Sequence, residues 1–82
     1  MPGLPLLAPV ALLVDLPEKG LTRGEMGTVV EYLGPETEPG VLVEFADDEG
    51  RTYAMADLTP DQLVVLHRRF RAGLEPAPGI PG

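Results

Sequence analysis

The chain has 82 residues, a formal net charge of −7 and no cysteine. A chain of this length forms one small domain, which buries only about 60% of the surface that its unfolded state exposes. The missing cysteines exclude disulfides and thiolate metal sites, and an acidic body disfavours general binding to nucleic-acid phosphates.

The first half of the chain predicts a lead-in and two strands. Residues 1–9 contain too many prolines to start a strand, so we expect a proline-rich lead-in there. The first strand is expected at residues 10–15, which read VALLVD. A polar loop containing Gly24 leads to a second strand at residues 27–33, which is rich in β-branched and aromatic side chains.

A hairpin is predicted next. Residues 41–45 read VLVEF, and their alternation places Val41, Val43 and Phe45 inward and Glu44 outward. The following DDEG stretch suits a type I turn closed by a left-handed glycine in a G1 bulge. The partner strand is expected at residues 51–56.

The segment that follows allows two interpretations. Thr59, Pro60 and Gln62 form a helix-start signal, so a helix could place Leu63, Leu66 and Phe70 on one face. The short apolar run LVVL is instead typical of a buried final strand. We predict one helical turn at residues 59–62 and then a fifth strand through about His67.

Five short strands without a long helix predict an all-β fold, a small five-stranded SH3-like barrel over residues 10–67 with one short 3-10 turn before its last strand. Residues 68–82 are expected to form a basic stretch and a flexible tail rich in proline and glycine. Gly24 and Gly50 are expected at positive φ, and Gly27 at a close approach of two backbones. The predicted core comprises Val10, Leu12, Val30, Val41, Val43, Phe45, Leu63 and Val65.

The sequence shows no catalytic constellation. Serine and cysteine are absent, and Lys19 and His67 are the only lysine and the only histidine. Nucleophilic catalysis needs an activated nucleophile beside a base, and a zinc site needs several imidazole or thiolate ligands. The acids of the DDEG turn fit hairpin chemistry better than a cation site. We therefore expect no enzyme activity, no metal and no cofactor.

Charge suggests two candidate binding surfaces. Residues 1–66 carry a net charge of −9, because three cations oppose twelve acids, whereas residues 67–82 carry +2. The first candidate is a protein-binding face that attracts a basic protein; its predicted residues are Glu31, Glu44, Asp47, Asp48 and Glu49. The second candidate is a nucleic-acid contact in which arginines clamp phosphate and an aromatic ring stacks on a base; its predicted residues are Arg68, Arg69, Phe70 and Arg71.

Three stretches of the chain together form a pattern: residues 15–31 read DLPEKGLTRGEMGTVVE, residues 43–52 read VEFADDEGRT, and residues 58–63 read LTPDQL. They resemble a small bacterial family of unknown function that is common in cyanobacteria. Its members read D-[LI]-P-x-x-G-L-x-x-G-x-x-G-T-V-V-E, then V-E-F-x-D-x-x-G-x-T, and close with L-x-x-x-Q-L. In this chain the likeness spans about residues 10–66. The first block is matched by Asp15, Pro17, Gly20, Leu21, Gly24, Gly27, Thr28, Val29, Val30 and Glu31. The later blocks are matched by Val43, Glu44, Phe45, Asp47, Gly50, Thr52, Gln62 and Leu63.

The resemblance implies an SH3-like barrel similar to the small barrel protein of photosystem I or to the variable chain of ferredoxin–thioredoxin reductase. It carries no activity and no catalytic residue. Some relatives are encoded beside small toxin-like proteins, which implies an immunity or antitoxin role as the partner of a basic protein. The stretch GEMGTVVE (residues 24–31) also resembles the glycine-then-strand pattern of KOW-type translation modules, which are usually basic where they bind RNA, whereas this chain is acidic.

Cellular setting follows from composition. The apolar run at residues 10–14 has strand length and lacks a basic leader, so we expect a cytoplasmic protein with no membrane partner. One glutamine, no asparagine and ten prolines are typical of a heat-adapted protein from a GC-rich genome. The oligomeric state and the identity of the partner stay open.

Overall fold

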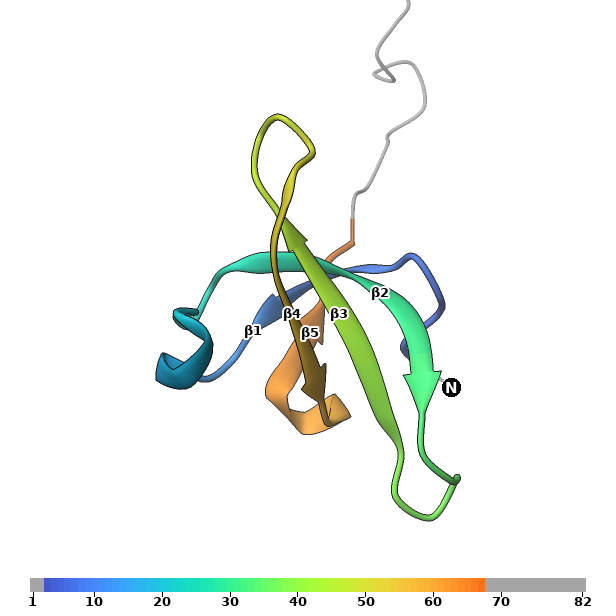
Figure 1. The fold of residues 1–82 in the computed structure, drawn as a ribbon. Coiled ribbons are helices and arrows are strands. Elements are labelled where there is room, and N and C mark those ends of the chain that lie inside the picture. Colours follow the sequence, from blue (N-terminus) through green and yellow to red (C-terminus); the bar gives the residue numbers. More distant parts are fainter. Residues whose placement is uncertain (1–2, 68–82) are drawn as a thin grey trace, which may run out of the picture.

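The computed structural model describes residues 3–67, and this part of the chain is all-β (Figure 1). Five antiparallel strands form one sheet in the order β4-β3-β2-β1-β5. Their bounds are β1 Pro9–Leu12, β2 Met26–Leu33, β3 Gly40–Ala46, β4 Thr52–Leu58 and β5 Leu63–Val65. Two 3-10 turns lie outside the sheet, η1 at Pro17–Lys19 and η2 at Pro60–Gln62. The predicted five-stranded fold, with a 3-10 turn before the last strand, is confirmed.

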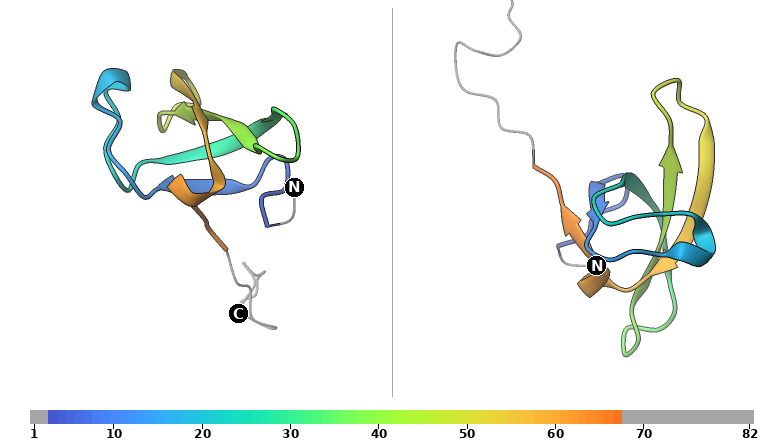
Figure 2. Two further views of the ribbon diagram at one scale, coloured as in Figure 1. Left: turned by 90° about the horizontal axis from the view of Figure 1, so that it is seen from below. Right: turned by 90° about the vertical axis from the view of Figure 1, so that its left-hand side faces the viewer.

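The sheet curls because β2 pairs with a different neighbour at each of its ends. Residues 26–28 pair with β1, with Ala11 opposite Met26, and residues 28–33 pair with β3, with Leu33 opposite Gly40. Figure 2 shows the result, with β1 and β5 lying across from β3 and β4. The inward side chains of the two halves therefore face one another.

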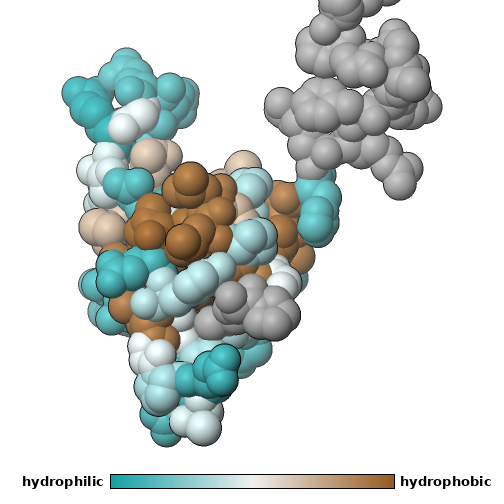
Figure 3. Space-filling model, turned by 90° about the vertical axis from the view of Figure 1, so that its right-hand side faces the viewer, coloured by the Kyte–Doolittle hydropathy of each residue, from teal (hydrophilic) through white to brown (hydrophobic). Residues whose placement is uncertain are grey.

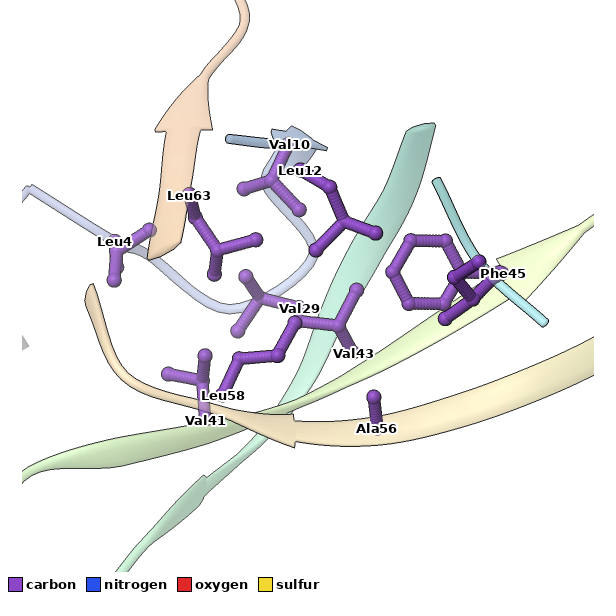
Figure 4. Packing of buried hydrophobic residues seen from close by; sticks show 11 residues of the cluster. Leu4, Val10, Leu12, Val29, Val41, Val43, Phe45, Ala56, Leu58 and Leu63 are labelled. Atoms are coloured by element: carbon purple, nitrogen blue, oxygen red, sulfur yellow. The ribbon is translucent and has the colours of Figure 1, made fainter. Parts of the chain in front are cut away.

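A hydrophobic core fills the space between these halves (Figure 4). Six of the eight predicted core residues are buried, namely Val10, Leu12, Val41, Val43, Phe45 and Leu63. Val65 is partly buried and packs against the cluster. The core also contains Leu4, Leu21, Val29, Ala56 and Leu58, which were not predicted.

The prediction that Val30 lies in the core is wrong, because β2 contains a bulge. Val29 is opposite Val43 and Glu31 is opposite Leu42, so Val30 is an extra residue without a partner on β3. Val29 is fully buried and Val30 is half-buried. The bulge shifts the alternation by one position, which keeps Glu31 on the outer side of the sheet.

The first and last strands are shorter than predicted. β1 ends at Leu12 rather than at residue 15, and β5 ends at Val65 rather than near His67. Residues beyond β1 form a loop that is closed by paired backbone hydrogen bonds between Leu16 and Leu21, at 2.9 and 3.1 Å. The loop places the Leu21 side chain in the core.

The lead-in packs against the sheet. Leu4 and Ala8 are buried, and the Tyr32 hydroxyl donates a hydrogen bond to the Leu4 carbonyl at 2.9 Å. Leu7 N–H donates to the Val29 carbonyl, and Val29 N–H donates to the Ala8 carbonyl. These bonds continue the β1–β2 pairing toward the N-terminus, so this segment covers one end of the core.

The local predictions at glycines and at η2 are confirmed. Gly24 and Gly50 have φ of +95° and +82°. A Cβ at Gly27 would lie 2.9 Å from the Glu44 carbonyl oxygen, so only glycine fits without movement. Before η2, the Gln62 side chain accepts a hydrogen bond from Thr59 N–H at 2.9 Å, as a capping box requires.

Candidate functional site

Two cross-strand rows cover the outer side of β2, β3 and β4. Thr28 is opposite Glu44, which is opposite Met55, and this gives the first row. The second row is formed by Glu31, Leu42 and Asp57 through the same pairings. We call these six residues the outer face.

The outer face combines carboxylates with apolar side chains. Glu31 and Asp57 are exposed and flank the half-buried Leu42, while Glu44 lies beside Met55, whose exposed fraction is 41%. Directly opposed side chains on neighbouring strands have Cβ atoms about 4.5–5.5 Å apart. The arrangement therefore puts three negative charges around two apolar side chains.

No cation of the described residues neutralises this face. The ion pairs found within residues 3–67 both involve Arg51, which contacts Asp47 and Glu49 in the β3–β4 hairpin. The Glu44 carboxylate accepts a hydrogen bond from the Thr52 hydroxyl, which fixes it without removing its charge. Within residues 3–67 the outer face is consequently an acidic surface without a neutralising cation.

The predicted acids of the hairpin behave differently. Asp47 accepts hydrogen bonds from the Glu49 and Arg51 N–H groups, both at 2.9 Å, and Arg51 pairs with both acids. Gly50 N–H donates to the Asp47 carbonyl at 2.9 Å and closes the turn. Asp47 and Glu49 therefore hold the hairpin, whereas Asp48 is exposed at its tip. The structure joins Glu31 to Glu44 on one face but places the hairpin acids at the end of the sheet.

A short hydrogen-bond network lies beside the outer face. The Glu25 carboxylate accepts from Thr22 N–H at 2.7 Å and from the Tyr53 hydroxyl at 2.8 Å. These bonds, chiefly the one from Thr22, hold the pKa of Glu25 below its ordinary value of 4.5. The bond to Glu25 in turn raises the pKa of Tyr53 above 10.0. The network ties the β1–β2 loop to β4 through the ionised carboxylate of Glu25.

An open groove of about 680 Å³ adjoins the outer face at Asp57. It lies between the β2–β3 loop and the junction of β4 with η2, at the lower end of the molecule in Figure 1. Its apolar lining is supplied by Leu33, Pro39, Leu58 and Pro60, and its carboxylates are those of Glu38, Asp57 and Asp61.

An apolar turn precedes β1. Ala8 N–H donates to the Pro5 carbonyl at 3.1 Å, which leaves Leu6 and Leu7 exposed by 51% and 73%. Leu7 has a φ of +67°, a conformation that a branched side chain rarely adopts. Figure 3 shows apolar side chains gathered in the middle of the side that carries the N-terminal segment, with hydrophilic ends above and below. The prolines of residues 1–9 predict only a lead-in, and no local sequence pattern indicates this exposed apolar turn.

The other residues that the sequence singled out do not form a site within residues 3–67. Lys19 and His67 are exposed, and this range contains no group of three or more His, Asp or Glu residues that could hold a metal ion. In the same range there is no helix with the length and apolarity needed to cross a bilayer. The candidate nucleic-acid contacts Arg68, Arg69, Phe70 and Arg71 lie outside the described residues.

Comparison with known proteins yields one family. The profile of the family described as Domain of unknown function (DUF4926) matches residues 6–65. No curated protein and no solved structure shows a significant match. The matched range covers all five strands, both 3-10 turns and every residue of the outer face. The chain is thus a member of the DUF4926 family, whose function is unknown.

Proposed function

We propose that this chain is a non-catalytic protein-interaction module whose outer face binds a basic protein. The observation that carries the proposal is the pair of cross-strand rows, in which Glu31, Glu44 and Asp57 surround Leu42 and Met55 without a neutralising cation among residues 3–67. Apolar side chains supply contact area, and unneutralised carboxylates attract and orient a partner of opposite charge.

The net charge of the described part supports a basic partner. Residues 3–67 carry twelve carboxylates and three cations, a difference of nine negative charges. Such a field raises the rate of encounter with a positively charged protein and is screened by salt. A non-catalytic role fits a chain without serine or cysteine, whose single lysine and single histidine are both exposed.

The biological setting belongs to the same proposal. An immunity or antitoxin role would use the acidic outer face to cover the cationic surface of a small toxin-like protein. A cytoplasmic location would fit this role. The likeness to the small barrel protein of photosystem I stays a prediction, and nothing in the proposal depends on it.

The alternative is a nucleic-acid-associated, KOW-like barrel acting through Arg68, Arg69, Phe70 and Arg71. Its experimental signature is distinct, because binding to nucleic acid weakens with salt and the slope falls when arginines are removed. The acidic outer face would repel phosphate, so we place this alternative second.

The proposal is tested by capture from a lysate of the native organism on immobilised protein, followed by purification of the retained protein. We expect a basic protein that is retained by the wild type and released by salt. The double variant Glu31→Gln, Glu44→Gln should bind it at least several-fold more weakly. The control Glu18→Gln, Glu36→Gln removes the same charge away from the outer face and should change affinity by less than about twofold.

Equal affinity of the two double variants would contradict the proposal, because net charge alone would then explain the binding. Retention of nucleic acid instead of a protein would favour the alternative.

A further inference from the structure

The groove beside Asp57 has the composition of a site for a long cationic side chain. Leu33 and Pro39 line it from the side of the β2–β3 loop, and Leu58 and Pro60 line it from β4 and η2. Leu58 is 3% exposed and belongs to the core, so the groove lies directly over the core and its accessible apolar surface comes mainly from the other three residues. The volume, about 680 Å³, is within the range of about 300–1,000 Å³ that is typical of ligand sites.

The charged part of the lining is entirely negative. Glu38 and Asp57 are exposed, and neither carboxylate has a hydrogen bond or an ion pair with another residue of the range 3–67. Asp61 accepts a hydrogen bond from the Thr59 hydroxyl and so stabilises η2. Glu38 and Asp57 are therefore available to an incoming group.

The described cations lie elsewhere. Lys19 and Arg23 belong to the β1–β2 loop, and Arg51 is paired within the β3–β4 hairpin. That hairpin lies at the upper end of the molecule in Figure 1, whereas the groove lies at the lower end. No positive charge of residues 3–67 fills the groove.

We propose that this groove binds an arginine or lysine side chain carried on an extended segment of a basic partner protein. Methylene stems of such side chains pack on apolar surface while their charged heads stay near water. A guanidinium can pair with a carboxylate through two parallel hydrogen bonds. The apolar lining suits the stem, and the carboxylates of Glu38 and Asp57 suit the head. A neutral segment would leave both charges partly desolvated and unpaired.

Asp57 connects this groove to the outer face. It stands opposite Leu42 in the second row and also lines the groove. A partner segment that crosses the outer face toward β4 reaches the groove without leaving the surface. The inference rests on the proposed function and specifies where a cationic anchor of the partner would sit.

The test is an NMR titration of the uniformly ¹⁵N-labelled chain with a tetra-arginine peptide amide. We expect shifts at the amides of Gly34, Gly40 and Thr59, which line the groove, and no comparable shift at Gly50. Tetra-citrulline has almost the same shape without the charge, and we expect it to leave these amides unchanged.

Matched variants give the energetic half of the test. The double variant Glu38→Gln, Asp57→Asn should weaken binding about two- to fivefold for each carboxylate removed. The control Glu18→Gln, Asp48→Asn removes the same charge far from the groove and should bind within about twofold of the wild type. None of these four side chains makes a hydrogen bond or an ion pair within residues 3–67, so we expect both double variants to fold. The ¹⁵N spectra of the free variants check this.

Several outcomes would overturn the inference. Shifts confined to the amides of Thr28, Glu44 and Met55, which belong to the outer face and do not line the groove, or equal affinity of both double variants, would contradict a groove site and leave the proposed function intact. Equal binding of tetra-citrulline and tetra-arginine would show that the groove does not recognise the guanidinium charge. Absence of any shift with tetra-arginine would also contradict the groove site, whereas the proposed function is judged by the captured protein and its dependence on Glu31 and Glu44.

Discussion

Single residues hold this sheet together through steric limits as much as through contacts. A Cβ on Gly27 would lie 2.6 Å from Val43 Cγ1 and 2.9 Å from the Glu44 carbonyl oxygen. The side chain of Val43 could move, but the backbone of β3 is paired on both sides. At Gly50, by contrast, a Cβ would meet no atom within 4 Å, and only the positive φ disfavours other residues.

Gly27→Ala should therefore destabilise the chain by about 1–3 kcal/mol, as overpacking does in other cores. Gly50→Asn should cost clearly less, because asparagine tolerates the left-handed region, while Gly50→Val should cost more than Gly50→Asn. Urea unfolding of the three variants measures the order. A Gly27→Ala variant as stable as the wild type would show that β3 yields to the added methyl group.

The Glu25–Tyr53 contact predicts a change in titration. Tyr53→Phe removes one of the two main hydrogen bonds to the Glu25 carboxylate, so the pKa of Glu25 should rise toward 4.5. It should stay below 4.5 because the hydrogen bond from Thr22 N–H remains. Tyr32→Phe is the control, since the Tyr32 hydroxyl contacts the Leu4 carbonyl instead. NMR titration of the Glu25 carboxyl measures both.

The sign of the pH effect follows from the direction of the Glu25 shift. A carboxyl group with a lowered pKa in the folded state stabilises the fold above pH 4.5, and this contribution is lost as pH falls through the folded-state value. Tyr53→Phe should therefore reduce the loss of stability on acidification. An unchanged Glu25 pKa in Tyr53→Phe would contradict the contact.

At the scale of elements, the fold depends on inward side chains of β3. Phe45 is fully buried, and its ring lies close enough to Gly27 that a Cβ there would be 3.0 Å from Cδ2. Phe45→Ala should cost about 3–5 kcal/mol of unfolding free energy. Met55→Ala, at an exposed position of the neighbouring strand, should cost less than about 1 kcal/mol. A loss below about 1 kcal/mol for Phe45→Ala would place the ring outside the core.

The lead-in is a second element with a measurable role. Leu4 is 5% exposed, whereas Leu6 is 51% exposed. Leu4→Ala should destabilise by about 2 kcal/mol or more, and Leu6→Ala should change stability by less than about 0.5 kcal/mol. Chemical denaturation compares the two variants. Equal, small effects would mean that the segment before β1 contributes nothing to the core.

A structural feature could be predicted from the sequence where residues close to it in the chain determine it. The turn at Thr59–Gln62 and the hairpin at Gly50 follow from residues within four positions, so both were predicted correctly. The bulge at Val30 lies just beyond the part of β2 that pairs with β1, and Leu4 is buried in a cluster formed with residues from all five strands. Neither feature is visible in a local pattern.

The outer face could be predicted in part from the sequence, whereas the groove could not. Alternation predicted that Glu31 and Glu44 point outward, and the structure places them on one face. Met55 and Asp57 alternate with the inward Ala56 and Leu58, so the pattern of residues 52–58 contained a signal that could have been used. The groove depends on the conformation of the β2–β3 loop, which no sequence pattern specifies.

At the scale of the whole molecule, charge and shape separate two surfaces. The core side of the curled sheet is closed by the strands themselves, by Leu4 of the lead-in and by Leu21 of the β1–β2 loop. The outer face carries apolar side chains and carboxylates that no cation of residues 3–67 neutralises, and it leads to an acidic groove.

The central claim, that this outer face receives a basic protein, is tested most directly by the association rate constant of the captured partner at increasing salt. Between about 0.01 M and about 1 M salt the screening length falls from about 30 Å to about 3 Å, so the wild-type rate should fall at least tenfold. Glu31→Gln, Glu44→Gln should associate more slowly at low salt, with a shallower salt dependence, while Glu18→Gln, Glu36→Gln should stay close to the wild type. A rate that is independent of salt, or equal slopes for the two double variants, would contradict the claim.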